Sequence, residues 1–200
     1  MEPPVPSLDR HPMEHLLDLA RAALTAAVDG RPAPEPDGAA HPEMVAPADA
    51  FVTLTADGTL RGCMGTLGAE MATGEAVIRA AGLAATRDPR FPPVVPGELA
   101  SLCVEVSVLG PPHPLADHAR FVPGRDGIVV EAGGRRALLL PQVATEMGWG
   151  TTEMLDAACE KAGLHADAWR ERGTRLLAFE VERASGPLLA TAEPASSRGG

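Results

Sequence analysis

A β-hairpin early in the chain restricts the possible folds more than any other feature of the sequence. The strand-like run Phe51–Thr55 is followed by the turn pair Asp57-Gly58 and by a second extended run, which ends in the motif Leu60–Thr66 (LRGCMGT). Asp-Gly between two apolar runs is a strong signal for a two-residue hairpin turn. The sequence therefore predicts antiparallel strands at residues 50–56 and 59–65.

Hydrophobic periodicity predicts the remaining elements. Helices are expected at residues 11–28, 73–87, 142–147 and 151–162, and strands at 102–109, 127–130, 136–140 and 176–182. Strand 102–109 alternates cleanly, so that Cys103, Glu105 and Ser107 face the side opposite to its valines. Helices and strands are mixed without a regular βαβ rhythm. The pattern therefore favours an α+β fold of mainly antiparallel sheets with flanking helices.

Proline and glycine mark the limits of the domain. Residues 1–10 are rich in proline, and residues 184–200 are small, polar and rich in glycine and proline, so we expect both ends to be disordered. A stretch at 31–48 contains five prolines and is expected to be an exposed connection. We therefore expect one folded domain at residues 11–183.

Charge and composition exclude several classes of protein. The chain has 27 acidic and 17 basic residues, a net charge of −10, which argues against nonspecific nucleic-acid binding. The sequence has no run of 18 apolar residues, so it predicts no membrane span, and the N-terminus lacks the pattern of a signal peptide. We therefore expect a cytoplasmic protein with no membrane contact. Its three cysteines form neither a disulfide framework nor a CxxC metal pattern.

The LRGCMGT motif combines a thiol, a cation and two glycines. Arg61 stands two residues before Cys63, so on a regular strand both side chains share a face. A thiol beside a guanidinium is shifted toward its nucleophilic thiolate, and Gly62 and Gly65 open access and offer backbone N–H groups to an anion. Thr66 completes this predicted binding segment. Alternatively, Cys63 is a small buried thiol that fills a tight hairpin. The sequence leaves the two interpretations level.

Arginine and glutamate side chains extend the predicted site. Arg61 and Arg90 could clamp a carboxylate or phosphate, but for each alone a structural ion pair with Glu105 or Asp88 is the better expectation. Glu105 is a candidate general base, and it shares its strand face with Ser107. The alternative is that this face is simply solvated.

Two further observations concern ligands. Gln142 follows a proline at the end of an apolar strand, where its amide would orient a ligand or, as the safer expectation, cap the next helix. The histidines show no HxxxH or HxH spacing, so we predict no zinc or iron site and no cofactor.

Several motifs in a consistent order resemble the AMMECR domain family, known in prokaryotes as AmmeMemoRadiSam system protein A. They are FVTL at residues 51–54, GxLRGCMGT at 58–66, DPRFPP at 88–93, EVSVL at 105–109, GI at 127–128, LLLPQVA at 138–144 and GW at 148–149. The resemblance extends from about Leu16 to Glu182. It implies an α+β fold with a larger and a smaller subdomain around a cleft. It also implies a pathway link to Memo-like, dioxygenase-fold proteins and to radical SAM enzymes.

Two hypotheses of function follow. In the first, the chain is an enzyme or enzyme subunit that binds a small anionic substrate in a cleft at the LRGCMG motif, with Cys63 as nucleophile or acid and Glu105 as base. In the second, it is a binding or adaptor module without chemistry of its own, which serves a Memo-like or radical SAM partner. Exposure of the Cys63 sulfur discriminates between them.

Overall fold

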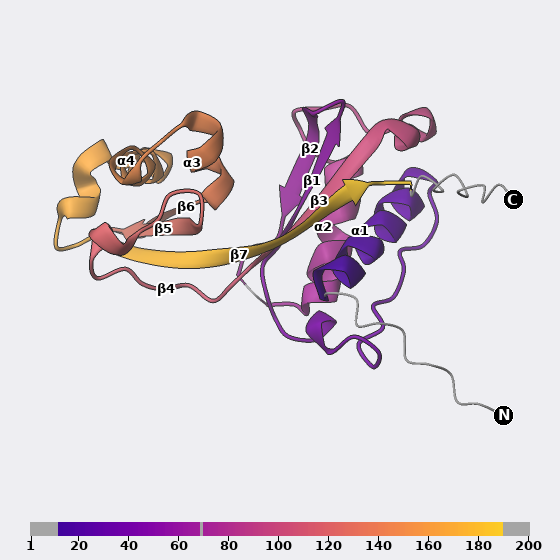
Figure 1. The fold of residues 1–200 in the computed structure, drawn as a ribbon, viewed down its shortest axis with the longest axis horizontal. Helices are drawn as coiled ribbons and strands as arrows, with labels where there is room; N and C mark the ends of the chain where they lie inside the picture. The colour runs from indigo at the N-terminus through magenta and orange to yellow at the C-terminus, as the bar shows by residue number, and fades with distance from the viewer. Residues whose placement is uncertain (1–11, 69, 190–200) are drawn as a thin grey trace, which may run out of the picture. The chain divides into compact units, whose positions relative to one another are not determined.

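The computed structural model describes residues 12–68 and 70–189, which form helices and antiparallel strands in two compact units (Figure 1). Unit 1 comprises the chain up to Val108 and the residues from Arg183 onward, and unit 2 comprises Leu109–Glu182. The predicted α+β class is confirmed. Within the described ranges, no helix combines the length and apolar character needed to cross a membrane.

Unit 1 is built on the predicted hairpin. Strands β1 (Ala50–Ala56) and β2 (Thr59–Gly65) are antiparallel, and β3 (Leu102–Leu109) pairs with the other side of β1. Asp57 and Gly58 both have positive φ, as a type I′ turn requires. The strand order is β2-β1-β3, followed by the C-terminal part of β7 (Arg175–Pro187), so β2 is the edge strand.

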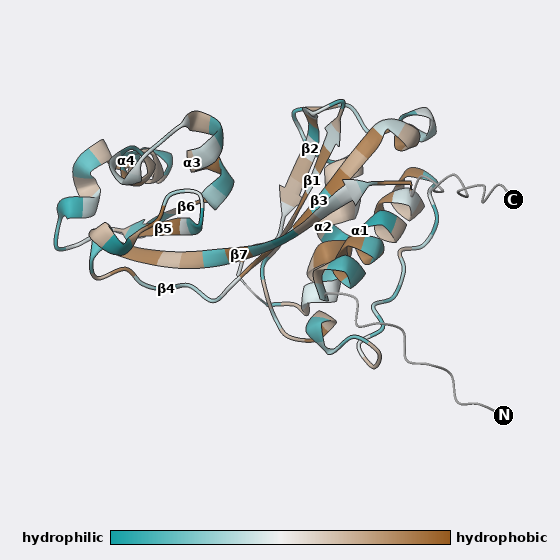
Figure 2. Cartoon of the chain, viewed as in Figure 1, coloured by the Kyte–Doolittle hydropathy of each residue, from teal (hydrophilic) through white to brown (hydrophobic). Residues whose placement is uncertain are grey.

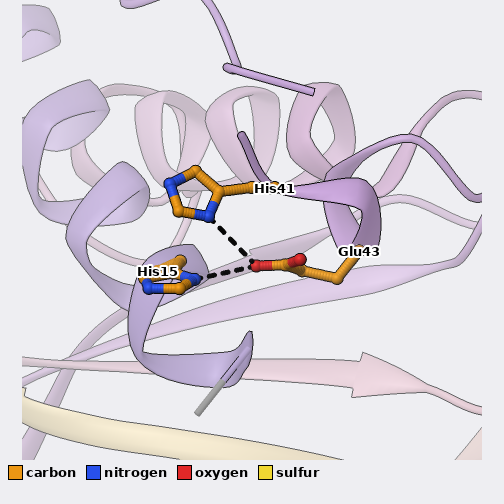
Figure 3. A group of neighbouring side chains, drawn as sticks. All are labelled: His15, His41 and Glu43. Atoms are coloured by element: carbon orange, nitrogen blue, oxygen red, sulfur yellow. Dashed lines mark hydrogen bonds and ion pairs between the residues drawn. The ribbon is translucent and has the colours of Figure 1, made fainter. Parts of the chain in front are cut away.

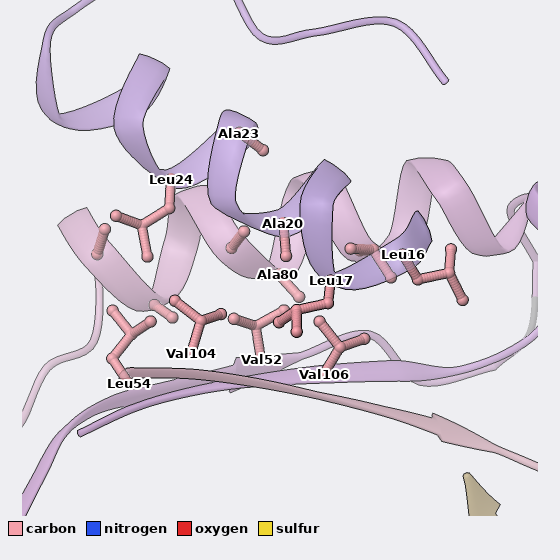
Figure 4. Close-up of a cluster of buried hydrophobic side chains, with 14 of the residues drawn as sticks. Leu16, Leu17, Ala20, Ala23, Leu24, Val52, Leu54, Ala80, Val104 and Val106 are labelled. Carbon is pink, nitrogen blue, oxygen red and sulfur yellow. The ribbon is translucent and has the colours of Figure 1, made fainter. Parts of the chain in front are cut away.

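Two helices cover one face of this sheet. Helix α1 (Pro12–Val28) and helix α2 (Thr73–Thr86) both bury apolar stripes at helical spacing. Figure 4 shows leucines and alanines of α1 above the valines and the leucine of β1 and β3, and Figure 2 shows the same hydrophobic stripes along helix and strands. Fully buried members of this core include Leu24, Val52, Leu54, Val77, Val104 and Val106. The alternation predicted for residues 102–109 is therefore correct for its apolar side.

Short 3₁₀ turns connect these elements. In unit 1, η1 (Pro42–Met44) lies in the proline-rich connection and η2 (Pro96–Ser101) precedes β3. Met44 is buried, and its Cβ lies close to Gly74 in the first turn of α2. The connection at 31–48 is therefore anchored to the core.

Unit 2 repeats the arrangement of helices on antiparallel strands. Its strands are β4 (His113–Pro114), β5 (Asp126–Ala132), β6 (Arg135–Leu139) and β7, with the order β6-β5-β7-β4. Its helices are α3 (Pro141–Met147), α4 (Thr151–Lys161) and the 3₁₀ turns η3 (His118–Arg120) and η4 (Ala166–Arg170). Ile128 and Val130 of β5 pack with Met154 and Leu155 of α4 and with Trp169.

The C-terminal boundary predicted at residue 183 is wrong. Strand β7 continues to Pro187, and Leu188 is buried in the core of unit 1. Leu188 N donates to the Leu102 carbonyl at 2.7 Å, and Arg21 Nε donates to the Pro187 carbonyl at 2.9 Å. Backbone hydrogen bonds and the burial of Leu188 together order this segment. The predictions for residues 1–10 and 190–200 lie outside the described residues.

Candidate functional site around Cys63

Three side chains stand in register across three strands of unit 1. Cys63 on β2 pairs with Thr53 on β1, and Thr53 pairs with Glu105 on β3. This row lies on the face opposite to α1 and α2, because the residues that alternate with it form the core. The Thr53 hydroxyl donates to Cys63 Sγ at 3.4 Å. All three residues are partly exposed, so the row is accessible to a small molecule.

The free edge of β2 at Cys63 is closed by the segment that follows α2. Asp88 Oδ2 accepts the Cys63 N–H at 2.8 Å, and Arg90 Nη2 donates to the Cys63 carbonyl at 3.2 Å. Both backbone groups that an edge strand leaves unpaired are thereby satisfied. The two side chains also bind one another, with Arg90 Nη2 2.7 Å from Asp88 Oδ2. They act together as a substitute for a neighbouring strand.

Asp88 carries a buried negative charge. Hydrogen bonds from the Arg90 side chain hold the pKa of Asp88 far below its usual range, and they outweigh the opposite effect of burial, while Cys63 N and Arg90 N add to the lowering. The same hydrogen bond raises the pKa of Arg90. Asp88 is 4% exposed, whereas the Arg90 side chain is 53% exposed. The structural ion pair that the sequence analysis set against an anion clamp is therefore formed at Arg90.

Arg61 does not lie where a regular strand would put it. The register between β1 and β2 shifts after Leu54, so Arg61 is an extra residue in β2 without a partner on β1. Its guanidinium binds both carboxylate oxygens of Glu98, at 2.7 and 3.1 Å, and donates to the carbonyls of Pro92 and Pro93. The expected partners Glu105 and Asp88 are wrong for Arg61, since these contacts tie β2 to the loop before η2.

The glycines of the motif have packing roles. A Cβ on Gly62 would overlap the backbone oxygen of Ala84, so Gly62 lets α2 approach β2 closely. Gly65 lies under the ring of Phe51, its partner on β1. Thr66 N donates to the Ala50 carbonyl, and its hydroxyl accepts from Ala50 N, which extends the hairpin. Instead of opening access to Cys63, the glycines position the strand that carries it.

The polar face of β3 is not uniformly solvated. Ser107 is 1% exposed, and its hydroxyl lies 3.4 Å from Glu105 Oε1. Cys103 on the same face is exposed. It pairs with Thr55, which in turn pairs with the exposed Leu60 near the hairpin turn, where the sheet ends.

Gln142 lies in unit 2, whereas the other predicted site residues belong to unit 1. Helix α3 begins after Leu140 with no side-chain cap, so the expected capping role of Gln142 is wrong. Its Oε1 is buried and has no hydrogen-bond partner among the residues that the structure describes. Its predicted role in binding a ligand stays a prediction.

Comparison with known proteins identifies the family. The AMMECR1 family model matches residues 17–184, which is most of the chain. The chain belongs to the AMMECR1 family. It is similar to a protein of Thermofilum pendens, with 39% identity over 183 residues (84% of this chain and 86% of the relative), and to one of Thermococcus gammatolerans, with 42% identity over 179 residues (84% and 87%). It is also similar to the crystal structure of uncharacterized protein PH0010 from Pyrococcus horikoshii, with a TM-score of 0.79 and 38% identity, covering 89% of this chain and 93% of that one.

The AMMECR1-family fold also brings together three residues that the sequence analysis did not single out as ligands. His15, His41 and Glu43 meet at one point of unit 1 (Figure 3). His41 and Glu43 are two residues apart, but His15 lies on α1, and no local spacing signals its approach.

Proposed function

We propose that this protein is an enzyme or an enzyme subunit that acts on a small anionic substrate at Cys63. The observation that carries the proposal is the row of Cys63, Thr53 and Glu105 at matched register positions. Two strand spacings separate the backbones of Cys63 and Glu105, about 10 Å, which leaves room for a small molecule above Thr53. As a nucleophile, the Cys63 sulfur bonds to the substrate while a leaving group departs, and the Glu105 carboxylate is the base that takes up the proton released. As an acid, Cys63 gives a proton to the substrate while Glu105 takes one from it.

The hydroxyl of Thr53 supports this chemistry. It donates a hydrogen bond to Cys63 Sγ, which fixes the position of the sulfur beside Thr53. Ser107 has the matching position beside Glu105, where its hydroxyl contacts Oε1. Each reacting group therefore has one hydroxyl neighbour that orients it.

Arg90 is the contact for the anion in this proposal. Among the described residues, hydrogen bonds engage its Nε and Nη2 but not its Nη1, and its side chain is half exposed beside Cys63. Arg61 is less suited, because Glu98 and two carbonyls use its guanidinium.

Alkylation with a matched pair of reagents tests the proposal. Iodoacetate is anionic and iodoacetamide is neutral, and both report the thiolate of Cys63 when Cys103→Ser removes the exposed thiol. The measured quantity is the ratio of the iodoacetate rate to the iodoacetamide rate at Cys63, divided by the same ratio for a free cysteine. We expect this ratio to fall about fivefold in Arg90→Gln, which corresponds to a charge contact of ~1 kcal/mol. Arg90→Lys should retain it in part. If Cys63 reacted only in denaturant, its role as a nucleophile would be excluded.

The alternative is a binding or adaptor module for a Memo-like or radical SAM partner in the cytoplasm. Exposed apolar side chains near the Arg61–Glu98 pair favour it: Leu60 precedes Arg61, and Val95 donates its backbone N–H to Glu98. In this alternative Cys63→Ala alters stability only, whereas Leu60→Asp and Val95→Asp weaken the complex with the partner. If Cys63 is unreactive and the two aspartate variants bind the partner more weakly, the protein is an adaptor.

A further inference from the structure

His15, His41 and Glu43 direct their polar atoms at one point. His15 Nδ1 lies 2.9 Å from Glu43 Oε1, and His41 Nδ1 lies 3.5 Å from the same oxygen (Figure 3). A ligand atom from each of the three residues lies within 4.8 Å of the other two. The side chains are 22%, 30% and 22% exposed, so water reaches the group.

The backbone holds all three residues in place. His15 is followed on α1 by the buried Leu16 and Leu17, which fix the rotation of the helix. The carbonyl of His41 accepts the N–H of Met44 at the start of η1, and the buried Met44 side chain anchors this turn. The arrangement therefore does not depend on a flexible loop, although His41 and Glu43 lie in the proline-rich connection.

The distances are compatible with a bound metal ion. Ligands of a tetrahedral zinc ion at about 2.0–2.2 Å are separated from one another by about 3.3–3.5 Å. The His41–Glu43 separation of 3.5 Å lies in this range, and the 2.9 Å hydrogen bond between His15 and Glu43 would open slightly to admit the ion. The imidazole rings are only 4.0 Å apart, a distance at which two imidazolium ions would repel one another. Neutral rings with both Nδ1 lone pairs on one cation avoid this repulsion.

Glu43 supplies a carboxylate oxygen beside both rings. Two neutral imidazoles and one carboxylate are the donor set of many zinc sites that keep an open coordination position.

We propose that His15, His41 and Glu43 bind a zinc ion through three protein ligands, with water in the fourth position. The ion joins α1 to the connection at 31–48 and adds a metal-bound water to this surface of unit 1. The site shares no residue with the row at Cys63, so its existence is independent of the proposed function.

Titration of the metal-free Cys63→Ser/Cys103→Ser protein with Zn²⁺ tests the proposal. The two substitutions remove the accessible thiols, which would bind zinc on their own. We expect one zinc ion per chain, a rise in melting temperature with zinc, and a Co²⁺ derivative with the visible absorption of a four-coordinate N/O site. Affinity should fall in acid, because metal ligands bind only in their deprotonated forms.

Substitutions at the ligands and at a matched histidine give the decisive comparison. His15→Ala, His41→Ala and Glu43→Gln should each weaken zinc binding by at least about 100-fold. His165 is the control: it contacts Asp167 through Nδ1 and Glu171 through Nε2, on opposite sides of its ring, so His165→Ala should leave the affinity unchanged. Circular dichroism without metal establishes that each variant folds. Zinc binding that is absent, or that survives all three ligand substitutions, would overturn the proposal.

Discussion

The two units each bury one aspartate against an arginine, but they use the pair differently. Asp88 in unit 1 and Asp126 in unit 2 are 4% and 5% exposed, and each binds the half-exposed guanidinium of a neighbouring arginine, Arg90 or Arg125. Asp126 accepts its backbone hydrogen bond from Val122, four residues away. Asp88 accepts one from Arg90, two residues away, and a second from Cys63, which is 25 residues away on β2.

Sequence separation therefore decides what a buried carboxylate does. Asp126 shapes the turn that leads into β5, a local task. Asp88 fixes the end of α2 to the edge of β2, and through this contact it positions the candidate nucleophile. A long-range contact of this kind limits how far β2 can move relative to α2, so the rigidity of the site depends on Asp88.

Replacement of the two aspartates should produce the largest difference between the units. Asp88→Ala leaves the N–H of Cys63 and the Arg90 side chain without their acceptor, and we expect a loss of about 3 kcal/mol in the free energy of unfolding. Asp126→Ala should cost less, because a turn of five residues can rearrange. Urea unfolding followed by circular dichroism measures both.

Asparagine variants serve as controls for this comparison. Asp88→Asn keeps one acceptor oxygen and the side-chain volume, so it should retain part of the stability that Asp88→Ala loses. The chain's two tryptophans lie in unit 2, so their fluorescence follows that unit alone. Equal losses for Asp88→Ala and Asp126→Ala would show that sequence separation does not matter here.

Glycines give the next largest contrast. Gly62→Ala forces α2 away from β2 against a backbone oxygen, and we expect a cost of about 2–3 kcal/mol. Gly65 and Gly127 each lie under a cross-strand phenylalanine, Phe51 in unit 1 and Phe179 in unit 2. The partly exposed Phe51 ring can move aside and alanine favours the strand, so Gly65→Ala should lose only about 1 kcal/mol. Phe179 is buried, so Gly127→Ala should cost more than Gly65→Ala. Thermal or urea unfolding of the three variants provides the measurement. A loss of stability below about 1 kcal/mol in Gly62→Ala would contradict the close approach of α2 to β2.

Local patterns made the fold largely predictable. The Asp57-Gly58 turn, the alternation in β3 and the apolar stripes of α1 and α2 depend on neighbouring residues, and the structure has all of them within one or two residues of the expected limits. The extension of β7 beyond residue 183 was missed because Ala184–Pro187 carries no apolar alternation. Backbone hydrogen bonds and the burial of Leu188 order that segment, and side-chain alternation does not report them.

Cys63 and Glu105 of the candidate row were named from the sequence, but Thr53 between them and the geometry of the row were not. Cys63, Glu105 and Arg90 stood out by residue type, and strand register brings the first two to one row. The extra residue at Arg61 left no trace in the sequence, although it changes where that guanidinium points. The pairing of Arg61 with Glu98, 37 residues on, and the approach of His15 to His41 depend on tertiary packing alone.

The two buried aspartates should make the stability of the fold depend on pH in the acid range. The pKa of Asp88 and that of Asp126 are both lowered in the folded protein, so each carboxylate stabilises the fold above its unfolded pKa of about 3.9 and loses this contribution as the pH falls further. We expect stability to decline below about pH 4.5, and the decline to be shallower in Asp88→Asn than in Asp126→Asn. Urea midpoints from pH 6 to about pH 2.5 measure it. Parallel curves for Asp88→Asn and the unsubstituted protein would refute a stabilising charge at Asp88.

The smallest contrast concerns ion pairs that are less buried. Arg61–Glu98 in unit 1 has side chains 14% and 32% exposed and two hydrogen bonds, whereas Arg175–Glu131 in unit 2 is 70% and 27% exposed with one. Double-mutant cycles with alanine separate the pair energy from the contacts of Arg61 with Pro92 and Pro93. We expect a coupling of about 1–2 kcal/mol for Arg61–Glu98 and below about 0.5 kcal/mol for Arg175–Glu131. Salt should weaken the second coupling more, because water and ions reach it. If the two couplings were equal, Arg61 would not be held by Glu98, and its guanidinium would be available to an anion beside Cys63.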